Sequence, residues 1–106
     1  MKSVKPRRLS RDLLVGIWRS VDEFTSAVEY RVTKKKTGYV VVVCDTSDGE
    51  LAEVFDTMWK KEDGVLSFAA HWPSTGRFSR CQMRLISESQ VAFTFTYTDT
   101  DVLHRK

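Results

Sequence analysis

Residues 78–97 read FSRCQMRLISESQVAFTFTY, and this stretch decides the fold class. In its first half Cys81 and Met83 alternate with polar residues, and in its second half aromatic or aliphatic residues again occupy every second position. Alternation with period two is typical of a β-strand that has one apolar face and one solvent-exposed face. The stretch therefore predicts two strands, Phe78–Ile86 and Gln90–Tyr97, joined by a short polar turn.

The rest of the chain carries similar β-rich runs, and no stretch has helical periodicity of useful length. Glycine closes four short polar segments between the runs, at Gly38, Gly49, Gly64 and Gly76. Tight hairpins require positive φ at such positions, and hairpins join antiparallel neighbours. The other predicted strands are Ile17–Val21, Ala27–Thr33, Tyr39–Cys44, Leu51–Trp59, Val65–Trp72 and Val102–Arg105.

The chain of 106 residues is long enough for one domain with its own apolar core. A meander of about eight short strands predicts a closed barrel, because a flat sheet leaves its apolar face in water and both edges unpaired. Ser10 predicts an N-capped single helical turn that ends at Val15. The predicted fold is an all-β, antiparallel up-and-down barrel over residues 10–106, preceded by a flexible basic arm at residues 1–9.

The tripeptide Gly16-Ile17-Trp18 opens the first predicted strand, directly after the helical turn. It is similar to the Gly-x-Trp motif of the lipocalins, members of the calycin superfamily. In that family an arginine of the last strand stacks on the tryptophan, and Arg105 stands at the corresponding place. The resemblance implies a small, bacterial-type lipocalin-like barrel that is closed by Gly16, Trp18 and Arg105 and holds a ligand inside.

The interior of an eight-stranded barrel is either filled with side chains or holds one small molecule, and the alternation fits both. Asp56 falls between Val54 and Met58 on the predicted inner face. A carboxylate there indicates a bulge, an ion pair with an arginine, or a group that orients a ligand or exchanges protons. We predict non-covalent binding of a small, largely apolar molecule. The predicted ligand-binding residues are Tyr30, Asp56, Met58, Phe68, Trp72, Met83, Phe95 and Tyr97.

The net charge of +3 comes from the first twelve residues, where five basic residues face one acidic residue. The remaining chain is close to neutral. Arg80 and Arg84 form a polar stripe, but the outside of a solvated barrel needs such a stripe in any case. We therefore do not expect nucleic acid as a partner.

Motifs for catalysis or cofactor binding are missing from the sequence. Cys44, Cys81, His71 and His104 lack metal-ligand spacing, and there is no glycine-rich phosphate loop or nucleophile elbow. We expect no metal and no cofactor, and no motif in the sequence predicts an enzymatic reaction. The basic N-terminus lacks the apolar run of a secretory signal, and no stretch is long enough to span a membrane, so a cytoplasmic location is expected.

The predicted strand Tyr39–Cys44 breaks the alternation, because it is apolar on both faces. Its outer face must then be covered by the helical turn, by the basic arm or by a second subunit. The last possibility predicts a homo-oligomer, most simply a dimer. An alternative function follows from it: an interaction module with a solid core that acts through its outer face or its basic arm.

Overall fold

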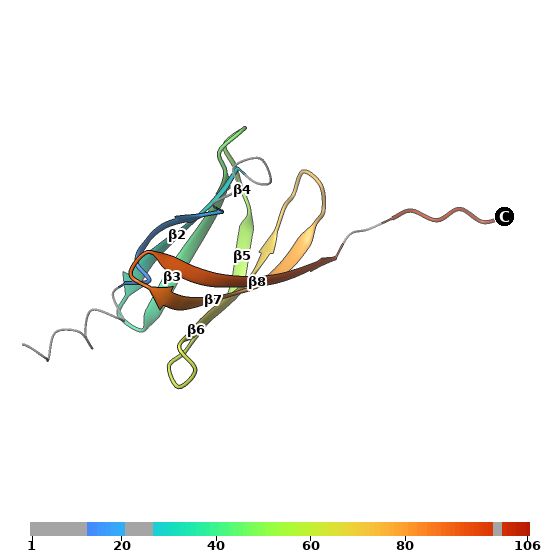
Figure 1. The fold of residues 1–106 in the computed structure, drawn as a ribbon. Helices are drawn as coiled ribbons and strands as arrows, with labels where there is room; N and C mark the ends of the chain where they lie inside the picture. The colour runs from blue at the N-terminus through green and yellow to red at the C-terminus, as the bar shows by residue number, and fades with distance from the viewer. Residues whose placement is uncertain (1–12, 21–26, 99–100) are drawn as a thin grey trace, which may run out of the picture.

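A computed structural model describes residues 13–20, 27–98 and 101–106, and the basic arm predicted at residues 1–9 lies outside these ranges. The described chain consists of strands and turns, without a helix (Figure 1). The strands are β1 (Gly16–Arg19), β2 (Val28–Lys35), β3 (Gly38–Asp45), β4 (Glu50–Leu51), β5 (Glu53–Lys60), β6 (Val65–His71), β7 (Phe78–Ser87) and β8 (Gln90–Thr98).

The strands form two four-stranded sheets with the orders β1-β2-β3-β4 and β5-β6-β7-β8. Every pairing is antiparallel and joins neighbours in the sequence, which confirms the predicted meander. The predicted closure is not found: within the described chain, β1 and β8 are not paired with each other. Two sheets that face each other can bury an apolar surface without closing, so the need to shelter that surface does not enforce a barrel.

The chain passes from the first sheet to the second at Ala52. The predicted single strand Leu51–Trp59 is divided there into β4 and β5. The Ala52 amide still donates to the Val43 carbonyl at 2.9 Å, which continues the pairing with β3, and from Glu53 onward the chain pairs with β6 instead. One nearly continuous strand therefore links the sheets and sets the angle between them.

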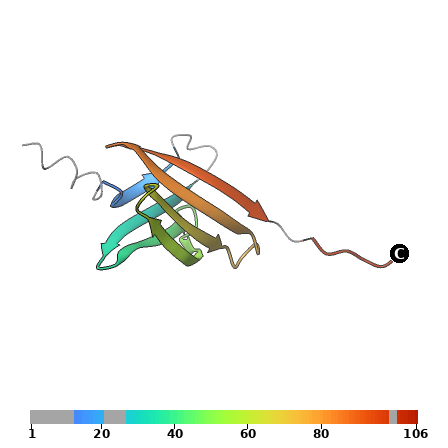
Figure 2. The same ribbon diagram turned by 90° about the horizontal axis from the view of Figure 1, so that it is seen from below.

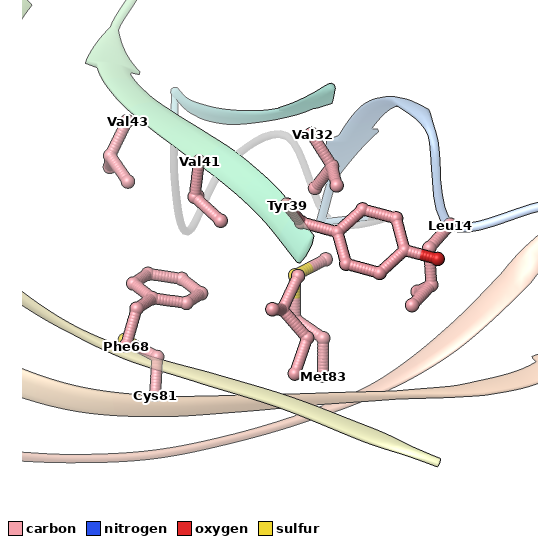
Figure 3. Close-up of a cluster of buried hydrophobic side chains, with 9 residues drawn as sticks. Leu14, Val32, Tyr39, Val41, Val43, Phe68, Cys81 and Met83 are labelled. Atoms are coloured by element: carbon pink, nitrogen blue, oxygen red, sulfur yellow. The ribbon is translucent and has the colours of Figure 1, made fainter. Parts of the chain in front are cut away.

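The two sheets share one apolar core, which lies between them (Figure 3). Tyr30 of β2 lies 4.7 Å from Phe93 of β8, and Tyr39 of β3 lies 5.3 Å from Trp59 of β5, measured between ring centroids. The buried residues of this core are Leu14, Val32, Tyr39, Val41, Val43, Leu66, Phe68, Cys81 and Met83. Removal of these side chains from water is the main stabilising contribution to such a fold.

The predicted turns lie between the strands, and three of the four glycines have positive φ; Gly38 does not. Gly64 shows why glycine is needed. Its amide and that of Asp63 both donate to the Lys60 carbonyl, at 2.8 and 3.2 Å, while φ of Gly64 is +67°. A residue with a β-carbon is strained at this φ, whereas glycine is not. Glycine therefore favours the tight β5–β6 connection.

A β-bulge interrupts β5 at Asp56. Asp56 and Thr57 together stand opposite Phe68, and φ of Asp56 is +58°. The extra residue reverses the alternation: Val54 faces the core before the bulge, whereas Trp59 faces it afterwards. Met58, predicted on the inner face, is therefore exposed.

The positive φ of Asp56 gives a prediction about stability. Asp56→Gly should leave the free energy of unfolding unchanged or raise it by at most about 1 kcal/mol, because glycine adopts this conformation without strain. Asp56→Val should lower it by about 1–2 kcal/mol, because a β-branched residue is strained there. Urea denaturation measures both changes.

The control for this pair is Arg80→Ala. It removes the exposed ion pair in which Arg80 Nη2 lies 4.0 Å from Asp56 Oδ2, and it leaves the backbone at the bulge intact. Exposed ion pairs contribute little, so Arg80→Ala should change the stability by less than about 1 kcal/mol. A loss on Asp56→Gly as large as that on Asp56→Val would contradict the role of φ.

Both ends of the chain differ from the prediction. The helical turn predicted at Ser10–Val15 begins outside the described residues, and Leu13 and Leu14 form a turn. The strand predicted at Val102–Arg105 is not formed: residues 101–106 are exposed, lack strand pairing and lead away from the body (Figures 1 and 2). A short segment becomes a strand only where another strand pairs with it, and within the described chain none pairs with this one.

Candidate ligand-binding site

A cavity of about 690 Å³ lies on the inner side of β7 and β8 and reaches across to β1 and β2. Its volume is in the range of pockets that bind small molecules. Aromatic rings and a thioether form most of its apolar lining, and these side chains are Trp18, Tyr30, Trp72, Met83, Phe93, Phe95 and Tyr97. Phe95 and Tyr97 are each 51% exposed, so the cavity is open to solvent along β8.

Strand alternation on β8 places three rings in one row. The centroids of Phe93 and Phe95 are 5.6 Å apart, and those of Phe95 and Tyr97 are 6.1 Å apart with nearly parallel planes. Side chains two residues apart on a strand point to the same face, which explains the row. Tyr30 continues it toward the other sheet, 4.7 Å from Phe93. The row forms an apolar wall with room for a flat or extended molecule beside it.

Trp18 lines the cavity from the first sheet, beside Tyr30. It stands opposite Tyr30 in the β1–β2 register, and its indole nitrogen donates a hydrogen bond of 2.9 Å to the Leu14 carbonyl. This bond satisfies the only polar group of the ring and fixes the ring orientation. The sequence predicted that Trp18 closes a barrel together with Gly16; in the structure Gly16 opens β1 and Trp18 lines the cavity.

The interior of the cavity holds groups that stay neutral around pH 7. Burial raises the pKa of the Tyr30 hydroxyl to about 12, and the neighbouring Cys81 adds to the shift. Burial also raises the pKa of the Cys81 thiol to about 11. A buried environment that disfavours charge is suited to an apolar ligand.

The mouth of the cavity carries a positive charge. Arg77 lines it, and the guanidinium carbon lies 4.6 Å from the centroid of the Tyr97 ring. The electrostatic attraction between a cation and an aromatic face holds the guanidinium beside this ring. Ser79, from the start of β7, and Gln90, from the start of β8, also line the cavity. An apolar interior with a polar, cationic rim matches a ligand with an apolar body and a polar or anionic end.

Five of the eight predicted ligand-binding residues meet around this cavity: Tyr30, Trp72, Met83, Phe95 and Tyr97. Phe68 belongs to the buried core instead, 6.3 Å from the Tyr30 ring. Asp56 and Met58 are exposed, and Asp56 pairs with Arg80. The bulge and the ion pair, both considered from the sequence, explain the position of Asp56.

Two arginines differ from the sequence-based expectation. Arg105 was expected to stack on Trp18, whereas Arg77 was not predicted at the site although it lines the cavity. Arg105 lies in the exposed C-terminal segment. The cation–aromatic pairs among the described residues are Lys34 with Tyr39, Arg77 with Tyr97 and Arg80 with Phe78. Arg77 is separated from Cys81 and Met83 by an even number of positions. The alternation of β7, extended back by one residue, could therefore have placed Arg77 on the inner face.

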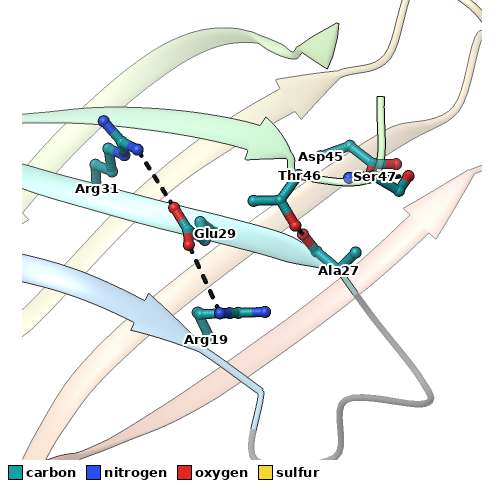
Figure 4. A network of polar contacts seen from close by, with 7 residues as sticks. All are labelled: Arg19, Ala27, Glu29, Arg31, Asp45, Thr46 and Ser47. Carbon is teal, nitrogen blue, oxygen red and sulfur yellow. Dashed lines mark hydrogen bonds and ion pairs between the residues drawn. The ribbon is translucent and has the colours of Figure 1, made fainter. Parts of the chain in front are cut away.

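The outer face of the first sheet is a second surface of interest. Glu29 of β2 lies between Arg19 and Arg31, with N–O distances of 3.8 and 3.5 Å (Figure 4). Beside this charged row, Ile17, Val42 and Leu51 are exposed. The sequence predicted a cover over the outer face of β3, and the described chain does not supply one.

Side-chain hydrogen bonds order the end of this sheet. The Thr46 hydroxyl donates to the Ala27 carbonyl at 2.7 Å, and the Ser47 hydroxyl and amide both donate to Asp45, at 2.6 and 2.9 Å (Figure 4). The bonds from Ser47, the side-chain bond first, lower the pKa of the Asp45 carboxyl. These contacts explain the tight β3–β4 turn.

Comparison with known proteins does not identify a relative. No protein-family model, no curated protein and no solved structure matches the chain. Over the described residues there is also no group of three or more histidine, cysteine, aspartate or glutamate side chains that could hold a metal ion. The described part contains no helix long and apolar enough to cross a membrane.

Proposed function

We propose that the protein binds a small, largely apolar molecule non-covalently in the cavity between its sheets. The observation that carries the proposal is the composition of the lining: six aromatic side chains, including Tyr30, and Met83 surround a space of about 690 Å³. Aromatic side chains offer large contact areas, and methionine adapts to the shape of a ligand. The Gly16–Trp18 motif, which resembles that of the lipocalins, is consistent with this function.

The chemistry of the rim refines the proposal. Arg77 supplies a positive charge at the mouth, while Tyr30 and Cys81 remain neutral inside. A ligand whose anionic group stays at the rim avoids the cost of burying charge. We therefore expect apolar molecules with one carboxylate, sulfonate or similar group to bind more tightly than uncharged ones of the same shape.

Native mass spectrometry on protein purified without denaturant is the first test. A mass excess that disappears when the same sample is sprayed unfolded would identify a bound molecule by weight. A native spectrum without any excess, together with no response to the probes described next, would contradict the proposal.

Two fluorescent probes test the site directly. 8-Anilinonaphthalene-1-sulfonate and N-phenyl-1-naphthylamine share the ring system, but only the first carries a sulfonate. Phe95→Ala should weaken both by about tenfold, because it removes one ring of the wall. Arg77→Gln should weaken the sulfonate probe by about tenfold and leave the neutral probe nearly unchanged. Fluorescence titration measures these affinities.

Phe55→Ala is the matched control. Phe55 is also a partly exposed phenylalanine, but it lies on the outer face of the second sheet and stacks on Phe78. Its removal should leave both probe affinities unchanged. Equal losses in Phe55→Ala and Phe95→Ala would show that the probes report loosened structure rather than the cavity.

The alternative is an interaction module that acts through its outer surface. Its supporting observation is the exposed apolar group Ile17, Val42 and Leu51 on the first sheet. Under this alternative Phe95→Ala lowers stability without changing any ligand affinity. The probe titration above therefore separates the two functions.

A further inference from the structure

The unpaired edge of β8 is the starting point for a second proposal. β8 spans nine residues and pairs with β7 from Phe78 opposite Thr98 to Ser87 opposite Gln90, while no described strand pairs with its other side. Half of its backbone N–H and C=O groups point along that side, which makes it a template for another strand. Phe95 and Tyr97 are half exposed beside it.

The C-terminal segment, residues 101–106, has the complementary property. Every one of its residues is exposed, including Val102 at 73% and Leu103 at 86%. It continues past the end of β8 and away from the body, as two perpendicular views show (Figures 1 and 2). Six extended residues span about 20 Å, the length of an ordinary strand. The segment therefore has the length and the apolar residues of a strand but lacks a neighbour in its own chain.

We propose that two copies of the chain exchange these segments. The C-terminal segment of each copy adds as an antiparallel strand to the open edge of β8 in the other copy. A two-fold dimer uses the same surface twice, and here one chain provides both the edge and the strand that pairs with it. The exchange satisfies backbone groups of both partners and covers Phe95 and Tyr97.

The register of the exchange follows from symmetry and from the faces of the strands. In a two-fold antiparallel pair, the residue numbers of any two opposite residues add up to the same sum. If this sum is even, odd-numbered residues stand opposite odd-numbered residues and stay on the cavity side of β8. A sum of 198 places Leu103 opposite Phe95 and Asp101 opposite Tyr97, so that two apolar side chains meet directly.

Analytical ultracentrifugation of the full chain over a wide concentration range tests the exchange. The wild-type chain should dimerise, and Leu103→Asp should weaken the dimer by at least about tenfold, because it places a carboxylate in the apolar seam. Leu51→Asp is the matched control: Leu51 is also exposed but lies on the outer face of the first sheet, and its replacement should leave the dimer intact. Circular dichroism checks that both variants are folded.

Amide hydrogen exchange locates the interface. In the wild-type dimer, the outward amides of β8 should be protected, and this protection should disappear both in Leu103→Asp and in a chain that ends at residue 100. Sedimentation and amide protection report the exchange without any ligand, so the exchange can fail while the probe titrations still show binding, and the reverse.

Three outcomes would overturn the exchange. The first is a wild-type chain that stays monomeric at every concentration. The second is a dimer that Leu51→Asp dissociates and Leu103→Asp does not, which would place the interface on the outer face of the first sheet. The third is β8 protection that persists in the monomeric variants, which would show that the exchanged segment is not what protects this edge.

Discussion

Leu66→Ala is expected to lower the free energy of unfolding by about 2–5 kcal/mol, the range measured when a large buried side chain leaves a cavity. Leu66 is fully buried near the start of β6, and it stands opposite Trp59 on one side and Met83 on the other. Domains of this size have total stabilities of about 5–15 kcal/mol, so the variant is expected to be close to unfolding at elevated temperature. Chemical denaturation monitored by tryptophan fluorescence measures the loss.

The same substitution at Leu51 provides the control. Leu51 is 57% exposed, so Leu51→Ala removes little buried surface and should cost less than about 1 kcal/mol. If the two variants lost similar amounts, the inner face of β6 would not be the core of the protein, and the packing of the two sheets would have to be reconsidered.

A second large effect is expected on raising the pH. The pKa of Tyr30 rises from its ordinary value of 10.0 to about 12 on folding, and that of Cys81 rises from 9.0 to about 11, both because of burial. In each case the folded state holds the proton more tightly than the unfolded state. The contribution of these two protonated groups to the free energy of unfolding is therefore fully present below about pH 9. It is lost progressively between pH 9 and 12.

The size of this loss follows from the shifts. Each group contributes roughly 1–2 kcal/mol once partial solvent access is taken into account. Thermal unfolding between pH 8 and 11.5 measures the decline, with the pH range set by these two pKa values.

Tyr30→Phe separates the two contributions. The variant removes the phenolic proton and keeps the ring, so it should match the wild type near pH 7 and lose less stability above pH 10. An identical pH dependence in variant and wild type would mean that Tyr30 ionises as freely as it does in the unfolded chain.

The sequence predicted the second sheet well, because one physical rule governs it. Residues of β7 and β8 alternate without interruption over most of their length, so period two was sufficient to assign Cys81, Met83 and Phe93 to the inside. The antiparallel meander followed from the short connections. Of the predicted ligand-binding residues, Met83, Phe95 and Tyr97 line the cavity for the same reason.

The features that the sequence did not predict have a common cause, because each depends on interactions between residues that are distant in the sequence. Nothing near Asp56 requires a bulge, since aspartate tolerates positive φ without demanding it, and one extra residue is enough to turn Met58 outward. Closure depends on how strongly the two sheets twist relative to each other after Ala52, which no local pattern encodes. Val102–Arg105 satisfied the strand pattern, but a pattern does not supply a partner strand.

The division of the core between the two sheets has a consequence for biosynthesis. Five of its nine buried residues precede Ala52 and four follow it, the last being Met83. While the chain is still emerging from the ribosome, β1 to β4 can pair with one another, but their apolar face has nothing to pack against. We expect the nascent chain to remain without a stable core until β7 has been synthesised, and to depend until then on chaperones or on the ribosome surface to shield its valine-rich third strand.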